Sequence, residues 1–189
     1  MSRHAFIRHT PLFICALALL FGPPGRAAAP SPLMPQANIG VNGFYAADKV
    51  QQGRALQAAI VLDIPDGFHV NANRLTNKFL IPTELKIDAP KGWRISAVSY
   101  PRAVVRRLSF SKDPVQLYEG RAVMRFSITV PANFNKGVAE LRARVHYQSC
   151  NNEVCYPPTS RDVTLPIAVV GATESVKRIN GQYFGGRRK

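Results

Sequence analysis

The chain has 189 residues, a length at which a single domain can bury a hydrophobic core. Hydrophobic residues make up 46% of it, which excludes an intrinsically disordered composition. The formal net charge of +14 would suit binding to nucleic acid, but no nucleic-acid-binding motif accompanies the charge. We therefore expect the basic residues to favour solubility and attraction to anionic surfaces or acidic partners, and we expect no nucleic-acid partner.

Residues 1–28 have the pattern of a secretory signal peptide. Arg3 and Arg8 precede an apolar run over 12–21, and small residues follow at 27–29. An uncleaved membrane anchor is the alternative, but a helix needs about twenty apolar residues to span a bilayer. We expect cleavage between Ala27 and Ala29, export to the periplasm, and no membrane span in the remaining chain.

Short strands separated by turns are predicted for most of the rest. Residues 29–38 are rich in Ala and Pro and are expected to form a flexible leader. Alternation of apolar and polar side chains predicts strands, and no segment has the period of a helix. The predicted strands lie at 56–64, 68–71, 82–88, 93–100, 122–130, 141–148 and 161–170. This pattern favours an all-β sandwich over residues 39–171, followed by a basic flexible tail over 172–189.

Two cysteines remain once the signal peptide, which contains Cys15, is removed. Cys150 and Cys155 are separated by four residues directly after a predicted strand, and Asn151 and Asn152 favour a turn between them. An even cysteine count in an oxidising compartment favours a disulfide. Closing so small a loop would constrain the unfolded chain by only about 2 kcal/mol. We therefore favour a redox-active pair, with a structural disulfide as the alternative.

A zinc site is a further alternative, in which His69 and His146 would join the two cysteines. Structural zinc sites usually show two closely spaced ligand pairs, and His146 falls on the polar face of its predicted strand. Hydrolase motifs and phosphate-binding glycine loops are absent from the sequence. We expect no metal and no cofactor.

The stretch VHYQSCNNEVCYPPTSRDVTLPI at 145–167 resembles the amino-terminal periplasmic domain of DsbD, a transmembrane disulfide reductase. The stretches PDGFHVNAN, FLIPTELKI, VSYPRA and LYEGRAVMRFSITV fit the same family in the same order. The resemblance covers about residues 40–170. It implies an immunoglobulin-like sandwich with the cysteine pair at one end.

The resemblance also implies a function. In the family, the domain takes electrons from a thioredoxin-like domain and passes them to periplasmic proteins, including disulfide isomerases and proteins of cytochrome c maturation. The second cysteine of the motif makes the intermolecular bond. By this resemblance Cys155 would be the exchanging thiol and Cys150 the resolving thiol of a thiol–disulfide interchange domain.

Four further residues are expected near the sulfurs. The family has a cap loop whose aromatic residue covers the disulfide, and Phe110 is the candidate, an ordinary core phenylalanine being the alternative. His69 and Asn71 stand where the best-known member has tyrosines, and Tyr156 follows the second cysteine.

The chain departs from the family pattern in its charges, spacing and extent. The cysteine spacing is four residues where the best-known member has five. Leu108 and Ser109 replace acidic residues before the cap aromatic, with Arg106 and Arg107 upstream. Because nearby positive charge favours thiolate, we expect this pair to ionise more readily than is usual in the family.

We expect neither a membrane electron conduit nor a thioredoxin-like domain in this chain. The expected partners are therefore thioredoxin-like periplasmic proteins and a separate membrane thiol reductase. A non-catalytic immunoglobulin-like binding module with a structural disulfide is the alternative from another functional class.

Overall fold

The strand β3 (Ala55–Asp63) shows how alternation divides side chains between two faces of a sheet. In the computed structural model, which describes residues 37–185, Ile60 and Leu62 lie in the main core while Ala59 and Val61 face outward. β3 pairs along its whole length with β9 (Arg121–Thr129). The strands β1 (Gly40–Tyr45) and β6 (Arg94–Ile95) complete a sheet of order β1-β3-β9-β6.

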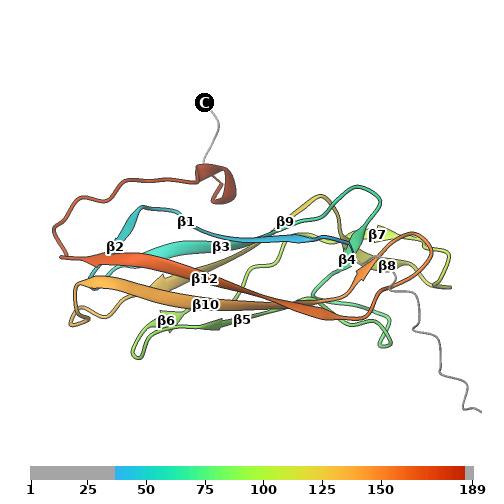
Figure 1. Ribbon diagram of the computed structural model, residues 1–189, viewed down its shortest axis with the longest axis horizontal. Coiled ribbons are helices and arrows are strands. Elements are labelled where there is room, and N and C mark those ends of the chain that lie inside the picture. Colours follow the sequence, from blue (N-terminus) through green and yellow to red (C-terminus); the bar gives the residue numbers. More distant parts are fainter. Residues whose placement is uncertain (1–36, 186–189) are drawn as a thin grey trace, which may run out of the picture. The chain divides into compact units, whose positions relative to one another are not determined.

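A second sheet packs against the core face of the first. Its long antiparallel pair is β10 (Gly137–Tyr147) and β12 (Thr159–Val170), and its edges are β5 (Glu84–Asp88) and β2 (Lys49–Gln51). The buried residues of both sheets form one hydrophobic cluster. Figure 1 shows the strands of the two sheets running as two layers. The hydroxyl of Tyr45 joins them by donating to the carbonyl of Leu165 at 2.9 Å.

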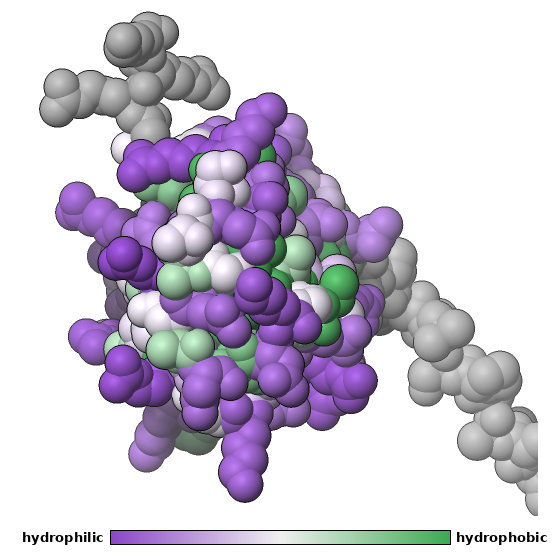
Figure 2. All heavy atoms as spheres, turned by 90° about the vertical axis from the view of Figure 1, so that its left-hand side faces the viewer, coloured by the Kyte–Doolittle hydropathy of each residue, from purple (hydrophilic) through white to green (hydrophobic). Residues whose placement is uncertain are grey.

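A third, smaller sheet carries the first cysteine at one end of the sandwich. Its order is β11 (Ser149–Cys150), β4 (His69–Asn71), β8 (Val115–Tyr118) and β7 (Val104–Arg106), and Figure 1 shows β4, β7 and β8 together at that end. Figure 2 shows the opposite end, where hydrophilic side chains cover most of the surface. Because β11 pairs with β4, the first cysteine lies at the end of the sandwich formed by the small sheet.

The predicted all-β, immunoglobulin-like sandwich is confirmed. The four strands with the longest alternation are found as β3, β9, β10 and β12. The short strands β1, β2, β7, β8 and β11 were not predicted, because segments of two to six residues are too short to show a clear alternation. No helix within residues 37–185 has the length and hydropathy of a membrane span. The predicted signal peptide, and the leader apart from its last two residues, lie outside the described part.

The segment after Gly171 differs from the flexible tail expected there. Up to Gly185 it packs back against the first sheet, where Ile179 N–H donates to the carbonyl of Ala46 and Asp48 N–H donates to that of Lys177, each at 3.0 Å. These bonds pair the segment with residues 46–48, which link β1 to β2. A polar sequence can make them because they join backbone groups.

Two aromatic side chains of this segment cover the outer face of the first sheet. The 3-10 turn η1 (Gly181–Tyr183) places the ring of Tyr183 on that of Phe44, with centroids 4.2 Å apart. Together with Phe184, these rings pack against three outward-facing buried residues: Ala59, Val61 and Val123. Covering this apolar face removes it from water and accounts for the position of the segment.

Replacement of the covering ring should weaken the domain. We expect Tyr183→Ala to lower the free energy of unfolding by about 1–2 kcal/mol, because a stacked ring and its apolar contacts are lost. The neighbouring Gln182 is exposed, and Gln182→Ala should change it by less than about 0.5 kcal/mol. Chemical denaturation of the two variants checks this. Equal stabilities would show that the ring is not needed over this face.

Candidate functional site

The two cysteines face each other across a tight β-hairpin. Cys150 ends β11, and Cys155 lies opposite it in the returning chain in antiparallel pairing. The backbone N–H of Asn151 donates to the carbonyl of Val154 at 2.9 Å and closes the turn. The two Cα atoms are 3.9 Å apart and the sulfurs form a disulfide. The expected pairing of these cysteines is confirmed, and the turn is what brings them together.

The side chain of Asn151 holds the turn. Its Oδ1 accepts hydrogen bonds from the backbone N–H groups of Glu153 at 2.8 Å and Val154 at 2.7 Å. Such local bonding is the reason that asparagine favours turns. Its Nδ2 donates to the hydroxyl of Tyr156 at 3.2 Å, which ties the turn to the returning strand.

The two sulfurs differ in their access to solvent. Cys150 is 0% exposed and lies between Cys155 and His69, its partner on β4. Cys155 is partly exposed. An attacking thiolate must reach a sulfur directly, so Cys155 is the one of the two that an incoming protein thiol can approach.

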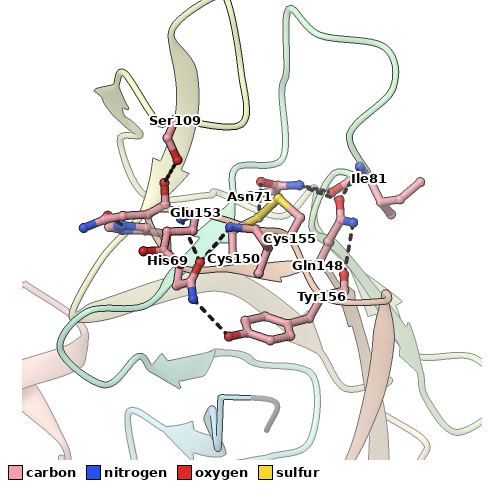
Figure 3. Close-up of a disulfide and its surroundings, with 12 residues drawn as sticks. His69, Asn71, Ile81, Ser109, Gln148, Cys150, Glu153, Cys155 and Tyr156 are labelled. Carbon is pink, nitrogen blue, oxygen red and sulfur yellow. Dashed lines mark hydrogen bonds between the residues drawn. A yellow bond between two sulfur atoms is a disulfide. The ribbon is translucent and has the colours of Figure 1, made fainter. Parts of the chain in front are cut away.

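Two side-chain amides, Asn71 and Gln148, hold one side of the disulfide. Asn71 is 0% exposed, and its Nδ2 donates to the carbonyl of Ile81 at 3.0 Å and to Oε1 of Gln148 at 2.9 Å. Gln148 Oε1 also accepts from the backbone N–H of Ile81 at 3.1 Å, and its Nε2 donates to the carbonyl of Tyr156 at 3.1 Å. Figure 3 shows Gln148, Ile81 and Tyr156 together on this side. The network joins β4, the chain before β5 and the hairpin into one rigid support.

A charged cluster lies on the other side. His69 Nε2 is 3.0 Å from Oδ1 of Asn152 on the hairpin, and its Nδ1 is 3.3 Å from Glu119 Oε1. Arg106 donates two hydrogen bonds to Glu119, at 2.9 and 2.8 Å. These hydrogen bonds from Arg106 hold the pKa of the Glu119 carboxyl below its ordinary value. The hairpin is therefore linked through His69 to an ion pair between Arg106 on β7 and Glu119, directly after β8.

The loop between β7 and β8 is attached directly to the hairpin turn. The backbone N–H and the hydroxyl of Ser109 both donate to the carbonyl of Asn152, at 3.2 and 2.7 Å. Figure 3 shows Ser109 reaching the turn from above, on the side of His69. A hollow of about 520 Å³ lies here, lined by His69, Arg106, Arg107, Leu108, Ser109, Asn152 and Glu153.

The residues expected near the sulfurs lie at different distances from them. Asn71 Oδ1 is 3.7 Å from the Cys150 sulfur, and His69 and Tyr156 contact the hairpin through Asn152 and Asn151. Phe110 is partly buried against an apolar cluster of the small sheet, formed by Leu80, Val104, Leu108, Val115 and Leu117. Its role as the cap stays a prediction.

Sequence reasoning missed three contributors to the site. Gln148 was seen only as part of the Tyr-Gln motif, and its polar position at the end of the predicted strand 141–148 gave no sign that its amide is the centre of a network. Glu119 and Ser109 are more than thirty residues from the cysteines in sequence. Only the packing of β8 and its preceding loop beside the hairpin brings them to it.

The positive charge expected beside the cysteines is partly neutralised. The guanidinium of Arg106 is paired with Glu119, whereas Arg107 is exposed and lines the hollow. The expectation that this cysteine pair ionises readily stays a prediction and would depend on Arg107. Within residues 37–185, no three His, Cys, Asp or Glu side chains gather in a way that could hold a metal ion.

The family model described as "Thiol:disulfide interchange protein DsbD, N-terminal" matches residues 42–167, more than half of the chain. Together with the Cys150–Cys155 disulfide, this match supports thiol–disulfide interchange. No curated protein matches the chain significantly.

Among solved structures, the chain is similar to the DsbD N-terminal domain of Neisseria meningitidis in the reduced form, at 15% identity and a TM-score of 0.42, over 68% of this chain and 88% of that one. It is also similar to the N-terminal periplasmic domain of ScsB from Proteus mirabilis, at 12% identity and a TM-score of 0.47, over 76% of this chain and 51% of that one. These identities are too low to transfer a function.

Lowering the pH should remove the contribution of Glu119. Because its pKa is depressed in the folded state, its contribution is present above the ordinary value of 4.5 and is lost as the pH falls through the folded value. We expect the stability difference between wild type and Glu119→Gln to shrink between about pH 5 and pH 3. Denaturation curves across this range measure it.

The control is Glu153→Gln. Glu153 is exposed in the turn between the two cysteines and forms no ion pair within residues 37–185. A difference between wild type and Glu119→Gln that stays constant with pH would contradict the role of the ion pair.

Proposed function

Because the chain belongs to the family of the N-terminal domain of the thiol:disulfide interchange protein DsbD, we propose that it relays electrons between a thioredoxin-like reductant and periplasmic partner proteins. The observation that carries this proposal is the Cys150–Cys155 disulfide, formed across a surface hairpin with one sulfur accessible. A disulfide that closes so short a loop contributes little to stability, which favours a chemical role.

The proposed exchange has two steps in each direction. A thiolate of the reduced partner attacks the sulfur of Cys155, the disulfide breaks, and Cys150 leaves with the electron pair and takes up a proton. The second thiolate of the partner then attacks its own sulfur in the mixed disulfide and releases Cys155. Two electrons have moved: the partner is oxidised to a disulfide, and the cysteine pair is reduced to a dithiol.

The reverse sequence passes the electrons on. Cys155 attacks the disulfide of an oxidised partner protein, and Cys150 resolves the mixed disulfide. The burial of Cys150 and the exposure of Cys155 support this division of roles, because the resolving thiol reacts only within the chain. The proposed activity is that of a protein-disulfide oxidoreductase without a cofactor.

The setting proposed for this exchange is the periplasm, with a separate membrane thiol reductase supplying electrons. Family membership supports this setting, since the domain of ScsB to which the chain is similar is described as periplasmic. Disulfide isomerases and proteins of cytochrome c maturation are the candidate acceptors by the same family membership.

The loop between β7 and β8 is proposed to shield the pair from nonspecific thiols, with Phe110 as its aromatic residue. Two observations support a loop that can open. It is attached to the turn by the two hydrogen bonds of Ser109, and Phe110 packs on a small cluster at the end of the domain rather than in the main core.

A single-cysteine variant tests the exchange. We expect Cys150→Ala, mixed with a thioredoxin-like protein that keeps only its attacking cysteine and carries it as a mixed disulfide with thionitrobenzoate, to accumulate a mixed disulfide through Cys155, because neither protein then has a second thiol to resolve it. Cys155→Ala is the matched control and should accumulate much less, because its remaining thiol is buried. Non-reducing electrophoresis and mass spectrometry measure both. Absence of the adduct, with a wild-type pair that reduced thioredoxin-like proteins do not reduce, would favour a binding module with a structural disulfide.

Release of the loop should expose the disulfide. We expect Ser109→Ala to increase severalfold the rate at which a small thiol such as dithiothreitol reduces the pair, because one of the two bonds to the turn is lost. Ser111→Ala is the control, since the Ser111 hydroxyl donates to Asp113 within the loop and not to the hairpin. Equal reduction rates in the two variants would contradict a shielding role for this attachment.

A further inference from the structure

The orientation of the Asn71 side chain is determined by backbone groups. The carbonyl of Ile81 can only accept a hydrogen bond, so the amide atom of Asn71 that lies 3.0 Å from it must be the nitrogen. The same logic applies to Gln148, whose Oε1 receives the N–H of Ile81 and whose Nε2 meets the carbonyl of Tyr156. Gln148 Oε1 then accepts from the same nitrogen of Asn71. Rotating the Asn71 amide would place its oxygen against two acceptors. Rotating the Gln148 amide would place its oxygen against the carbonyl of Tyr156 and its nitrogen against the N–H of Ile81.

The oxygen of Asn71 therefore points at the buried cysteine. Its Oδ1 lies 3.7 Å from the sulfur of Cys150, and both residues are 0% exposed. The backbone of Asn71 is held as well, since its N–H donates to the carbonyl of Gln148 at 3.0 Å and its carbonyl accepts from the hydroxyl of Thr83. Among residues 37–185, no other donor is placed on this oxygen.

The contact between Asn71 and Cys150 contributes a different free energy in the oxidised and in the reduced state. A disulfide sulfur carries no hydrogen, so in the oxidised form a buried acceptor faces an atom that cannot donate to it. A thiol is a weak donor, so reduction supplies the missing proton in the place where the acceptor already lies. A buried acceptor without a donor costs free energy, whereas a satisfied one does not.

We propose that Asn71, oriented by Gln148, stabilises the dithiol form of the pair by accepting a hydrogen bond from the thiol of Cys150. The inference rests on the proposed exchange function and adds to it a residue that regulates the redox equilibrium. The balanced step is the uptake of two electrons and two protons by the disulfide, with one of the protons placed between Cys150 and Asn71. The same bond keeps Cys150 protonated and leaves Cys155 as the first nucleophile.

The redox equilibrium of Asn71→Leu tests this inference. Leucine has a similar shape and no acceptor, so the pair should become harder to reduce. We expect the equilibrium constant against reduced and oxidised dithiothreitol to shift toward the disulfide by about twofold to fivefold, the range for one weak hydrogen bond. This shift corresponds to a reduction potential about 10–20 mV more negative. Approaching the equilibrium from both the oxidised and the reduced protein ensures that it has been reached.

The matched control is Asn73→Leu in the same segment. Asn73 Oδ1 accepts from the hydroxyl of Tyr118 rather than facing a sulfur, so its loss should leave the equilibrium unchanged. Gln148→Leu, which removes one of the two acceptors that orient the Asn71 amide, should shift the equilibrium in the same direction as Asn71→Leu by a smaller factor. It also serves as the second variant if Asn71→Leu does not fold.

Unfolding of the oxidised and of the reduced proteins separates the proposed role from a merely structural one. If Asn71 only supports the fold, Asn71→Leu will destabilise both forms equally and the equilibrium constant will not move, which overturns the inference. A larger loss in the reduced form supports it. Failure of the wild-type pair to exchange with thioredoxin-like proteins would instead overturn the proposed function, and this rate is measured independently of the equilibrium.

Discussion

The cross-strand pairing of Cys150 with Cys155 is the constraint on which the rest of the site depends. The turn held by Asn151 brings the two Cα atoms to 3.9 Å, and the pairing of Cys150 with His69 on β4 fixes the hairpin to the small sheet. Because one strand of the hairpin is in a sheet and the other is at the surface, one sulfur is buried and the other is accessible. The chemical inequality of the two cysteines is thus a consequence of sheet geometry.

The disulfide has a rigid side and a side that a partner could rearrange. On the first, the buried amide of Asn71 and the partly buried amide of Gln148 bond to each other and to backbone groups, and such polar networks rigidify the structure around them. On the second, His69 and the loop carrying Ser109 contact Asn152 of the turn, and Glu119 contacts His69 from behind. A partner that displaces the loop would leave the support of Cys150 intact.

The sandwich itself needs little beyond its alternating strands, and these were predictable. The apolar rows of β3, β9, β10 and β12 are long enough that only one face of each strand can enter the main core. The packing of residues 172–185 on the first sheet was not predictable, because the signal was the outward-facing Ala59 and Val61 in β3 rather than anything in the segment itself. Those two residues looked like ordinary members of an alternating strand.

The sequence by itself determined the class of fold, the turn and the cysteine pair, since alternation, asparagine turn chemistry and an even cysteine count are local properties. It also contains the cysteine motif that resembles the DsbD N-terminal family, and this resemblance pointed to Asn71 and His69. Only the tertiary structure decided how the surrounding groups contact the cysteine hairpin. Asn71, Glu119 and Ser109 come from segments distant in sequence, and hydrogen bonds between such segments are set by strand register and loop packing, which no local pattern encodes. The orientation of one buried amide toward Cys150 is the clearest case, because it follows from backbone groups of a third segment.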